Sequence, residues 1–596
     1  MTSCCNNSNG FDMKHITTYW KTYVVILVPL LLLPLPLLSP TPESRCGYVV
    51  LVMAFYWMTE ALPLAVTALI PLVGFPLLGV MSTGPLCLVY MKETNMMFLG
   101  GLTMAIAVEH SQLHIRIALL VLLYVGESPR RLLAGFMMTT MFLSMWISNT
   151  ASTAMMLPIV DAILKELYSK KREDEIPTSE GDLEIIKKSS RSSSLSSTQR
   201  RSSVLAQTNS VDGTKQDKED NDEEEELTKM GAQMRKTLLL AVAYSANIGG
   251  TGVVTGTTPN LILMANLEEF DETGLTFASW MGYNIPGMII CVAIAWIWLQ
   301  ILFMGCRKGA IQEATPEQRS AVRQILKKKY AALGDITFHE SVVLTLFVIL
   351  IFMWLFRSPE FVPGWAHWFV LAFGEIEVED ATAVMFIVLL VFIIPKKLDF
   401  WCFRDPKDTS PVVSYEGCLT WEVVQQKLPW GVVLLLGGGF AIAEAADASG
   451  LSLWLGDQLQ ALEVLPEALI VFLVCLMTAM VTEVASNTAT ASILMPVLKE
   501  MSLGIGINPL YLMLPATICC SYAFMLPVAT PPNAIIFTAA KMKTVEMMKA
   551  GIMMNVICVV VQTLMINTLG QAMFGVRDFP DWANETVTSS AALHAL

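Results

Sequence analysis

The sequence predicts an all-α polytopic membrane protein, on three observations. Of its 596 residues 54% are apolar and only 15% are charged, whereas about a quarter of the residues in soluble domains are charged. Apolar runs of the length that a bilayer requires, about 20 residues per helix, recur from residue 21 to residue 574. The runs are continuous and lack the alternation of a transmembrane β-barrel, so helices are the expected spanning elements.

The two ends of the chain are expected on opposite sides of the membrane. The first apolar run, 21–40, lacks the cleavage site of a signal peptide and is therefore a retained helix. Lys14 and Lys21 precede this run, which places the N-terminus in the cytosol by the positive-inside rule. A glycosylation sequon at Asn584 follows the last run. It predicts an extracellular C-terminus and an odd number of crossings.

Two polar segments separate the apolar runs. Residues 168–235 contain "SSRSSSLSSTQRRSSVL" and "DKEDNDEEEEL", a composition that buries too little apolar surface to fold alone. We expect a disordered cytosolic loop there, in which 200–204 is either a kinase substrate or an unmodified linker. Much of the net charge of −13 lies in this loop, so the charge indicates no nucleic-acid partner. The basic segment 306–339 is expected to be a cytosolic linker.

The chain contains an internal repeat. "SNTASTAMMLP" begins at Ser148 and returns as "SNTATASILMP" at Ser486, 338 residues later. A second matching pair, "GTTPNLI" from Gly256 and "ATPPNAI" from Ala529, is 273 residues apart. The two separations differ by 338 − 273 = 65 residues, which matches the loop inserted in the first half alone. The chain is therefore a duplicated unit with one interrupted copy.

Seven parts follow from the repeat and the polar segments. They are a cytosolic N-terminal tail (1–20), a first repeat with scaffold helices and a re-entrant hairpin (21–167), the disordered loop (168–235), the rest of the first repeat with a broken helix (236–305), the cytosolic linker (306–339), a second repeat with a hairpin and a broken helix (340–575) and an extracellular C-terminal tail (576–596).

Each half of the repeat carries two interrupted hydrophobic segments. The first reaches Ser-Asn-Thr and then resumes, which predicts a re-entrant helix hairpin with the tripeptide at its tip. The second is broken at Thr-Gly-Thr-Thr-Pro-Asn (255–260) or at Ala-Thr-Pro-Pro-Asn (529–533). Within the bilayer, a helix can be interrupted by non-helical backbone only where that backbone lines a cavity or is buried in protein. Matching breaks in two repeats point to a transporter's binding site, and we expect them to converge at the bilayer midplane.

The chemistry of these breaks suits an anion together with a cation. Hydroxyl groups and Asn side chains donate to carboxylate oxygens, and helix N-termini favour anions. Unwound carbonyls and hydroxyl oxygens suit sodium. The segments 132–164, 237–306, 428–498 and 500–540 contain no Lys or Arg. Because burying an unpaired charge costs several kcal/mol, a bound dianion is expected to need cations beside it.

Other interpretations stay open from the residues alone. A single Ser-Asn-Thr is most simply an interhelical hydrogen-bond patch, although two copies with broken helices disfavour this. Glu483 is either a structural carboxylate or a proton-coupling group. An enzyme is disfavoured because the chain lacks a Walker loop and a nucleophile elbow, and His339-Glu340 lacks the second His of a zinc protease. A channel would differ in conducting without coupled flux.

At these motifs the chain resembles the divalent anion:sodium symporter family, in its animal branch, solute carrier family 13, the sodium-coupled di- and tricarboxylate and sulfate carriers. The segments that carry the resemblance are "TEALPLAVTALIP" (59–71), "FLSMWISNTAS" (142–152), "LLLGGGFAIAE" (434–444) and "FMLPVATPPNAI" (524–535). The resemblance implies about eleven transmembrane helices plus two re-entrant hairpins in an inverted repeat, an elevator-type movement and a homodimer in the lipid of the plasma membrane. Sodium is the implied co-transported ion.

The resemblance also implies which residues form the site. The first sodium site would comprise Ser144, Ser148, Asn149 and Gly256, and the second Thr482, Ala485, Asn487 and Ala529. Substrate would lie against Asn149, Thr150, Asn487, Thr488, Thr257, Thr258, Thr530 and Pro531. The segment 109–119 departs from the family at Gln112 and Ile115, and we assign it no binding role.

Substrate choice follows from the same motifs. Thr488 and the Ala-Thr-Pro-Pro sequence from Ala529 differ from the Ser-Asn-Pro and Ala-Asn-Pro-Pro of sulfate-selective relatives, so carboxylates such as succinate and citrate are expected. The Thr258 hydroxyl and methyl groups either narrow the pocket around a four-carbon dianion or donate to citrate. The alternatives are a sodium/sulfate symporter and, as in some insect relatives, a sodium-independent carboxylate exchanger.

Overall fold

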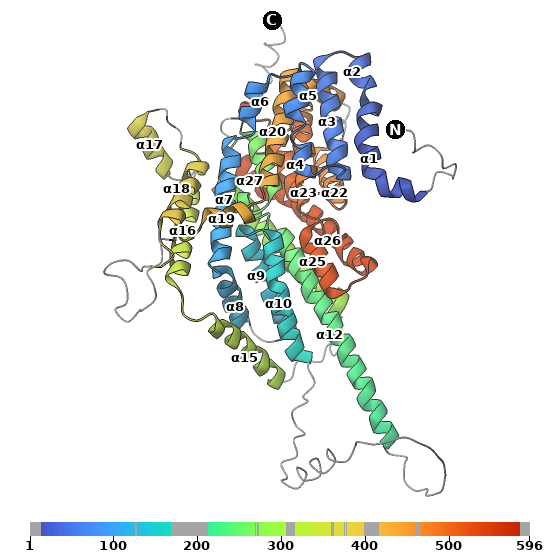
Figure 1. Cartoon of the computed structure of the whole chain (residues 1–596), viewed down its shortest axis with the longest axis vertical. Coiled ribbons are helices and arrows are strands. Elements are labelled where there is room, and N and C mark those ends of the chain that lie inside the picture. The colour runs from blue at the N-terminus through green and yellow to red at the C-terminus, as the bar shows by residue number, and fades with distance from the viewer. Residues whose placement is uncertain are drawn as a thin grey trace, which may run out of the picture.

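The computed structural model is built of helices (Figure 1). It describes residues 13–125, 128–168, 213–268, 270, 273–304, 316–358, 363–374, 376, 378–397, 416–459 and 465–583. In these ranges the extended structure is limited to one isolated antiparallel bridge between Pro395 and Gly417. The all-α class is confirmed. The sequon at Asn584 and the kinase-type sequence at 200–204 lie outside the described residues.

The N-terminal part is a group of helices that packs against the start of the second repeat. Its helices are α1 (Met13–Leu32), α2 (Pro34–Leu38), α3 (Pro42–Thr59), α4 (Leu64–Thr67), α5 (Pro71–Leu77) and α6 (Thr83–Val89). Pro42 occupies the start of α3, and the Thr41 hydroxyl accepts from the Ser44 N–H at 3.4 Å as its N-cap. Buried Trp57 and Phe75 join Leu435 of α20 in a separate small core.

The part of the first repeat that carries its tripeptide and its broken helix follows this group. Its elements are α7 (Glu93–His110), α8 (Leu113–Val125), α9 (Pro129–Trp146), α10 (Asn149–Tyr168), α12 (Gly213–Gly249), the 3₁₀ turn η1 (Val254–Gly256), α13 (Thr258–Leu267), α14 (Phe277–Leu299) and the π-turn η2 (Gln300–Met304). Between η2 and α20 lie α15 (Pro316–Ala332), α16 (Phe338–Leu355), α17 (Trp365–Phe373), α18 (Asp380–Ile393) and α19 (Trp421–Lys427).

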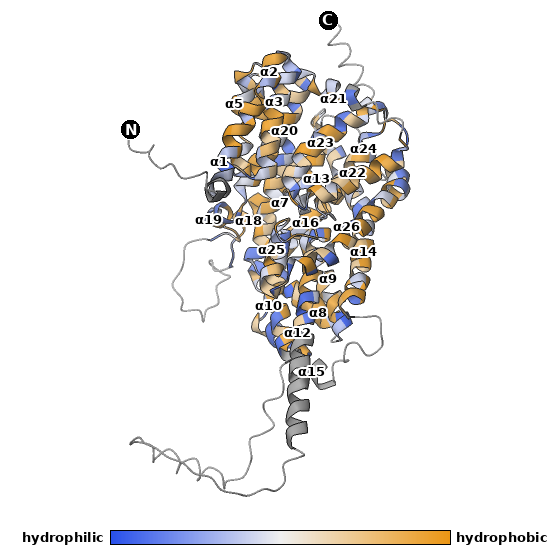
Figure 2. Ribbon diagram, turned by 90° about the vertical axis from the view of Figure 1, so that its right-hand side faces the viewer, coloured by the Kyte–Doolittle hydropathy of each residue, from blue (hydrophilic) through white to orange (hydrophobic). Residues whose placement is uncertain are grey.

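From α20 onward the second repeat has a similar order of elements, except that η1 has no counterpart among its described residues and one more short helix follows at the end. They are α20 (Trp430–Ser449), α21 (Leu451–Leu459), α22 (Glu467–Val481), α23 (Asn487–Gly504), α24 (Pro509–Cys520), α25 (Pro531–Ala540), α26 (Thr544–Met565), the π-turn η5 (Ile566–Gly570) and α27 (Gln571–Phe574). The last long helix of each repeat, α14 and α26, runs into a π-turn. The hairpin α9–α10 lies in the lower half of the molecule and the hairpin α22–α23 in the upper half in both ribbon views (Figures 1 and 2).

Several helices are long and apolar enough to cross a membrane. Among the described residues there are five: Thr18–Leu38, Phe277–Phe303, Phe338–Leu355, Trp430–Ser449 and Thr544–Phe574. A sixth is counted if the pair Thr83–His110 and Leu113–Val125, bent by 67°, is one broken span. Apolar residues run along the central helices (Figure 2). The chain is therefore a polytopic membrane protein.

The long helix α12 differs from our expectation for the polar loop. Residues 213–235 belong to α12, although we expected disorder over the whole of 168–235. The run of Glu residues at 223–226 consists of good helix formers, and the same helix continues directly into residues 237–249, which are buried in the core. Residues 169–212 are outside the described ranges.

Candidate functional site

Both Ser-Asn-Thr tripeptides mark the start of a helix. Ser148 connects α9 to α10, and its hydroxyl accepts from the Ala151 N–H at 3.2 Å. The Ser486 hydroxyl accepts in the same way from the Ala489 N–H at 3.2 Å and caps α23. Each Ser is thus an N-cap. The following Asn and Thr stand in the first helical turn, where all four side chains are only half-buried.

Three oxygen atoms meet at the first tip. The buried Ser144 hydroxyl lies 2.5 Å from Asn149 Oδ1 and 2.8 Å from the backbone oxygen of Ala246. A hydroxyl has one proton and donates to one acceptor at a time. The three oxygens therefore form a cluster with fewer donors than acceptors, which suits a hard cation.

The second tip repeats this cluster. Thr482 Oγ1 lies 2.8 Å from Asn487 Oδ1 and 2.7 Å from the backbone oxygen of Cys520. Thr482 directly follows α22 and Asn487 begins α23, and they match Ser144 in α9 and Asn149 in α10, 338 residues earlier. Two halves of one chain thus build the same arrangement of hydroxyl, amide and backbone oxygens.

The Asn residue of each Pro-Asn motif donates hydrogen bonds to the turn that precedes its helix. Asn260 Nδ2 donates to the backbone oxygens of Gly250 at 3.2 Å and Val253 at 2.9 Å. Asn533 Nδ2 donates to those of Ala523 and Leu526, both at 3.0 Å. Each Asn holds the non-helical turn that precedes its own helix.

The starts of α13 and α25 lack the side-chain caps that the two tips have. Thr257 and Thr530 stand at the N-cap positions, and neither hydroxyl caps its helix. The N–H groups of these first turns are therefore not taken up by a side-chain cap. Thr257 and Thr258 are half-buried and Pro531 is exposed.

Glycines bring the first tip close to the broken helix. A Cβ atom on Gly250 would stand 2.7 Å from Asn149 Oδ1. One on Gly256 would collide with the backbone oxygen of Gly250 and stand 2.9 Å from that of Met145. The second repeat has Ala529 at the position of Gly256, so only the first turn requires glycine for this approach.

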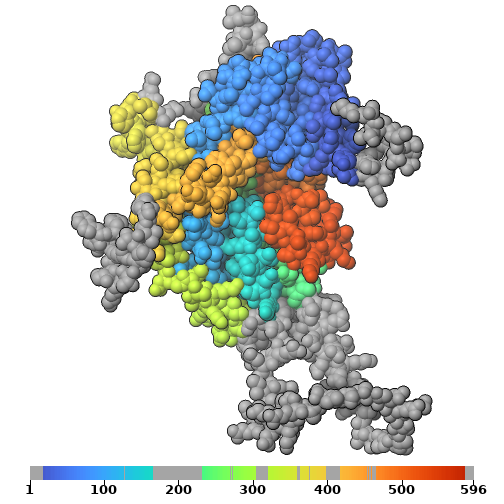
Figure 3. Space-filling view, in the orientation of Figure 1, coloured from blue at the N-terminus to red at the C-terminus, as the bar shows by residue number. Residues whose placement is uncertain are grey.

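The Asn247 side chain is one of those that link the two halves. Asn247 Nδ2 of α12 donates to the backbone oxygen of Ala523 at 3.0 Å and to Thr530 Oγ1 at 3.4 Å. The repeats also pack crosswise, α10 against α25 and α13 against α23. The hairpin α9–α10, coloured teal, lies beside the red C-terminal helices (Figure 3). The predicted residues thus form two groups, one at each tip, that are held together.

Glu483 is a structural carboxylate in this geometry. It is buried and accepts from the N–H groups of Phe524 at 2.7 Å, Met525 at 2.9 Å and Leu526 at 3.0 Å. Asn555 Nδ2 adds a fourth donor at 2.7 Å. The carboxylate therefore holds the turn before α25. The matching position of the first repeat is Met145, so this support exists in one half alone.

Sequence reasoning missed several members of the site. Ala246 and Cys520 contribute backbone oxygens, which no residue type reveals, and Asn247 was not distinguished from other polar residues of α12. Buried side-chain oxygens without a hydrogen-bond partner also surround the site. Among the described residues they include those of Asn247, Asn260, Ser521 and Asn533. Since buried polar atoms are normally paired, these oxygens are acceptors that a water molecule or a cation would satisfy.

Comparison with known proteins extends over nearly the whole chain. The family described as the sodium:sulfate symporter transmembrane region matches residues 14–576. The chain is 40% identical over 584 residues to the Na(+)/citrate cotransporter of Mus musculus, covering 96% of this chain and 99% of that protein. It is 42% identical over 579 residues to solute carrier family 13 member 2 of Homo sapiens, covering 96% of both. It is 41% identical over 602 residues to the Na(+)/dicarboxylate cotransporter 3 of Rattus norvegicus, covering 97% of both.

Proposed function

The chain belongs to the sodium:sulfate symporter transmembrane family, and from this premise we propose that it is a sodium-coupled symporter of di- and tricarboxylates. It imports anions such as succinate and citrate across the plasma membrane. The relatives of about 40% identity carry the names of sodium/citrate and sodium/dicarboxylate cotransporters, which supports sodium coupling and carboxylates over sulfate.

The observation that carries the proposal is the pair of matching oxygen clusters. Ser144, Asn149 and the Ala246 carbonyl form one, and Thr482, Asn487 and the Cys520 carbonyl form the other. Neutral hydroxyl, amide and backbone oxygens are ligands that sodium accepts. We assign one sodium ion to each cluster, with backbone oxygens of Ser148, Gly256, Ala485 and Ala529 as further ligands.

The substrate carboxylates bind at the N-termini of helices that lie between the two oxygen clusters. Four helices begin there, at Asn149, Thr258, Asn487 and Pro531. The N-terminus of a helix carries partial positive charge and N–H donors, so these starts bind carboxylates without Lys or Arg. We assign Asn149, Thr150, Asn487 and Thr488 as the main contacts, with Thr257 and Thr258 beside them. Thr530 is buried and its hydroxyl already accepts from Asn247, so it contributes through its backbone, next to Pro531.

Coupling follows from the charge of this site. A dianion held by neutral groups leaves a net negative charge in a medium of low dielectric constant. Two sodium ions neutralise it, and each contributes about 1.4 kcal/mol for a tenfold sodium gradient. A third ion would carry net positive charge inward and add about 2.3 kcal/mol per 100 mV.

The movement we propose is of the elevator type in a homodimer. Two re-entrant hairpins from opposite ends of the molecule and crosswise packing of the repeats (Figure 1) support an inverted repeat that moves as one body. In the plasma membrane the chain would cross about eleven times, with its N-terminus in the cytosol and its C-terminus outside the cell.

Uptake of labelled succinate, citrate and sulfate into expressing cells tests the proposal. In sodium medium the carboxylates are expected to enter and to compete with one another, and choline in place of sodium should abolish uptake. Faster uptake of sulfate would assign the chain to the sulfate carriers. Uptake of carboxylates that continues unchanged in choline would contradict sodium coupling and indicate an anion exchanger.

A further inference from the structure

A cavity outside the site described above lies at the corner between α7 and α8. Its volume is about 630 Å³, within the range of small-molecule sites. It is lined by the corner at 110–112, by parts of the segment 332–340 that joins α15 to α16, and by Lys396 and Lys397 after α18. The chain bends by 67° at this corner, and α15 packs against α8 next to it (Figure 1).

The lysines of this cavity are not paired with acidic groups. Lys396 is half-buried and Lys397 is exposed, and neither ammonium group forms an ion pair or a hydrogen bond within the described residues. Glu340 also lines the cavity, but its carboxylate is bound by Arg116, with Nη2 at 3.2 Å and Nε at 3.3 Å. The lining therefore carries an excess of positive charge.

Two imidazole rings stand beside these lysines. The rings of His110 and His339 meet edge to face, with their centres 5.8 Å apart. Nε2 of the buried His339 lies 2.8 Å from the Cys418 backbone oxygen, and since a carbonyl only accepts, Nε2 donates. The His110 ring forms no hydrogen bond among the described residues. The Lys396 ammonium acts electrostatically on both rings, so cationic and N–H groups gather in one part of the cavity.

Two acidic groups outside the lining act on the His110 ring. They are Glu109 and Glu416. Glu109 is paired with Lys427, whose Nζ lies 2.7 Å from its Oε1. Glu416 is exposed and forms no ion pair within the described part of the chain, so its charge weakens the positive field of the two lysines.

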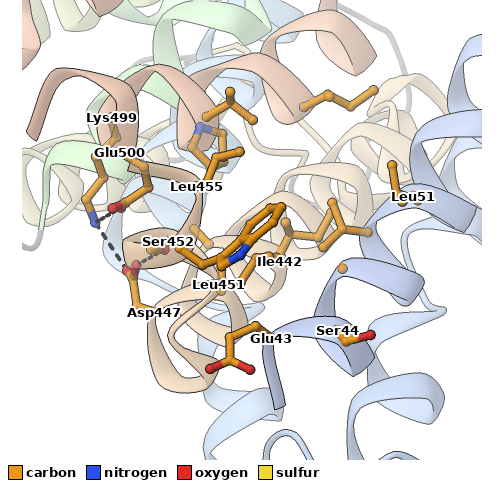
Figure 4. A pocket seen from close by; sticks show the side chains of 18 of the residues that line it. Glu43, Ser44, Leu51, Ile442, Asp447, Leu451, Ser452, Leu455, Lys499 and Glu500 are labelled. Atoms are coloured by element: carbon orange, nitrogen blue, oxygen red, sulfur yellow. Dashed lines mark hydrogen bonds and ion pairs between the residues drawn. The ribbon is translucent and has the colours of Figure 1, made fainter. Parts of the chain in front are cut away.

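Another, larger cavity differs in its charges. It has a volume of about 670 Å³ and lies between α3 on one side and α20, α21 and α23 on the other. The lysine in its wall, Lys499, lies 3.2 Å from Asp447 and 4.0 Å from Glu500 (Figure 4). Because this ammonium is compensated within the wall, the larger cavity attracts an anion less than the cavity at the corner does.

From this geometry we propose that the cavity at the corner binds an anion with a terminal phosphate group, held by the ammonium groups of Lys396 and Lys397 and by the N–H of His110. A terminal phosphate carries about two negative charges and three strong acceptor oxygens, which matches two cations and one further donor. The segment 109–119, to which the sequence assigned no binding role, thus supplies one of these groups. Binding of this anion is independent of the proposed function.

Two kinds of ligand carry such a group, a soluble phosphorylated anion and a lipid with a phosphomonoester headgroup. The basic segment 306–339, which ends at the cavity, is expected in the cytosol, so a ligand reaches the cavity from that side. Phe338 lines the cavity and is 37% exposed, which gives the chain of a lipid an apolar surface to contact. The experiment below distinguishes the two sources.

Binding is tested by thermal unfolding of the purified full chain in phosphatidylcholine nanodiscs. Potassium buffer without sodium is used, so that sodium-coupled binding at the transport site does not contribute. Pyrophosphate is expected to raise the unfolding temperature above that in potassium chloride of equal ionic strength, because a ligand that binds only the folded state stabilises it. In a second set of nanodiscs, phosphatidic acid replaces part of the phosphatidylcholine. A rise with phosphatidic acid alone would assign the cavity to a lipid headgroup, and no rise with either phosphate would overturn the proposal.

A double variant locates the site. Lys396→Gln together with Lys397→Gln removes both cations and breaks no ion pair or side-chain hydrogen bond within the described residues, so the fold should be kept. Lys327→Gln together with Lys328→Gln is the matched control, since both lysines are exposed on α15 and outside the lining. The first double variant should need about tenfold more phosphate ligand for the same stabilisation, and the control should respond like the unaltered chain. Equal responses of the two double variants would contradict this location.

Removal of an opposing charge tests the sign of the field. Glu416→Gln takes away the unpaired carboxylate that acts on His110, so about threefold less ligand should give the same stabilisation. Glu422→Gln on α19 is the control, since Glu422 is also exposed and lies outside the lining. A response that Glu416→Gln leaves unchanged or weakens would overturn the assignment of an anionic occupant. The binding result stands even if no carboxylate uptake is found and the proposed function fails.

Discussion

At the scale of single residues, the site depends on oxygen atoms placed by a few side chains. Ser144 and Thr482 stand at matching positions in the two repeats, and each brings its hydroxyl within 2.8 Å of an Asn side-chain oxygen and of a backbone oxygen. One position holds Ser and the other Thr, but both side chains present a hydroxyl oxygen. This indicates that the hydroxyl group, and not the size of the side chain, is what both positions require.

The hydroxyl of Thr482 should be needed for sodium affinity. Thr482→Val keeps the shape and removes one ligand, so the sodium concentration for half-maximal citrate uptake should rise about tenfold, a loss of about 1.4 kcal/mol. Thr482→Ser should behave like the unaltered chain. Thr478→Val is the matched control, because the Thr478 hydroxyl donates only to the Val474 oxygen one turn away, at 2.7 Å. Equal sodium dependence of the two Val variants would contradict a ligand role for Thr482.

The two Asn residues of the tips should be indispensable. Asn149→Ala and Asn487→Ala each remove an oxygen of a cluster and a donor for substrate, and both should abolish uptake at normal surface expression. Asn266→Ala is the control, since its amide donates to the Ile262 oxygen within α13 at 2.7 Å. The measurement is uptake normalised to surface-labelled protein. Normal kinetics in either tip variant would exclude the proposed position of the site.

At the scale of helices and turns, buried charged groups hold the turn before α25 and the contact between α8 and α16. Glu483 of the segment between α22 and α23 accepts from three successive N–H groups in the turn before α25. Arg116 of α8 is buried, pairs with Glu340 of α16 at 3.2 Å and donates to the Gly334 oxygen at 2.9 Å. Both are long-range contacts that join elements distant in the chain.

Glu483→Ala should destabilise the fold through this turn. The change leaves three backbone N–H groups and the Asn555 amide without their acceptor, and each unpaired buried group costs about 1–3 kcal/mol. The unfolding temperature of the purified chain should fall clearly. Glu467→Ala, at the exposed start of the same hairpin, should leave it unchanged. A Glu483→Ala protein as stable as the Glu467→Ala protein would show that the turn is held by other contacts.

Arg116 should be required for stability as well. Arg116→Leu leaves the Glu340 carboxylate buried and unpaired, which costs about 3–5 kcal/mol in comparable buried pairs. Thermal unfolding and the yield of folded protein are the measurements. Arg131→Leu, at an exposed position of α9, is the control. If both variants unfold at the same temperature, the pair of Arg116 and Glu340 contributes little to the fold.

At the scale of the whole molecule, the repeat visible in the sequence reappears as two matched sets of helices around the two tips. The all-α class, the helix starts at both tripeptides and the two broken helices could be predicted, because polar and Pro-containing breaks are conspicuous within apolar runs. The carbonyls of Ala246 and Cys520 could not, because every residue has a backbone oxygen and only the fold selects these two. The link from Asn247 to the second repeat depends on packing over 276 residues, which local sequence does not encode.

The central claim is that sodium and a carboxylate dianion are bound together and moved together. It is tested most directly by measuring labelled uptake and membrane current together in expressing oocytes while succinate or citrate is added at a series of sodium concentrations. The result expected is uptake that rises steeply with sodium and vanishes in choline, accompanied by an inward current where a third sodium ion is carried with the dianion. Carboxylate uptake that continues in choline without any current would contradict the claim, because the oxygen clusters at the two tips would then not couple sodium to transport.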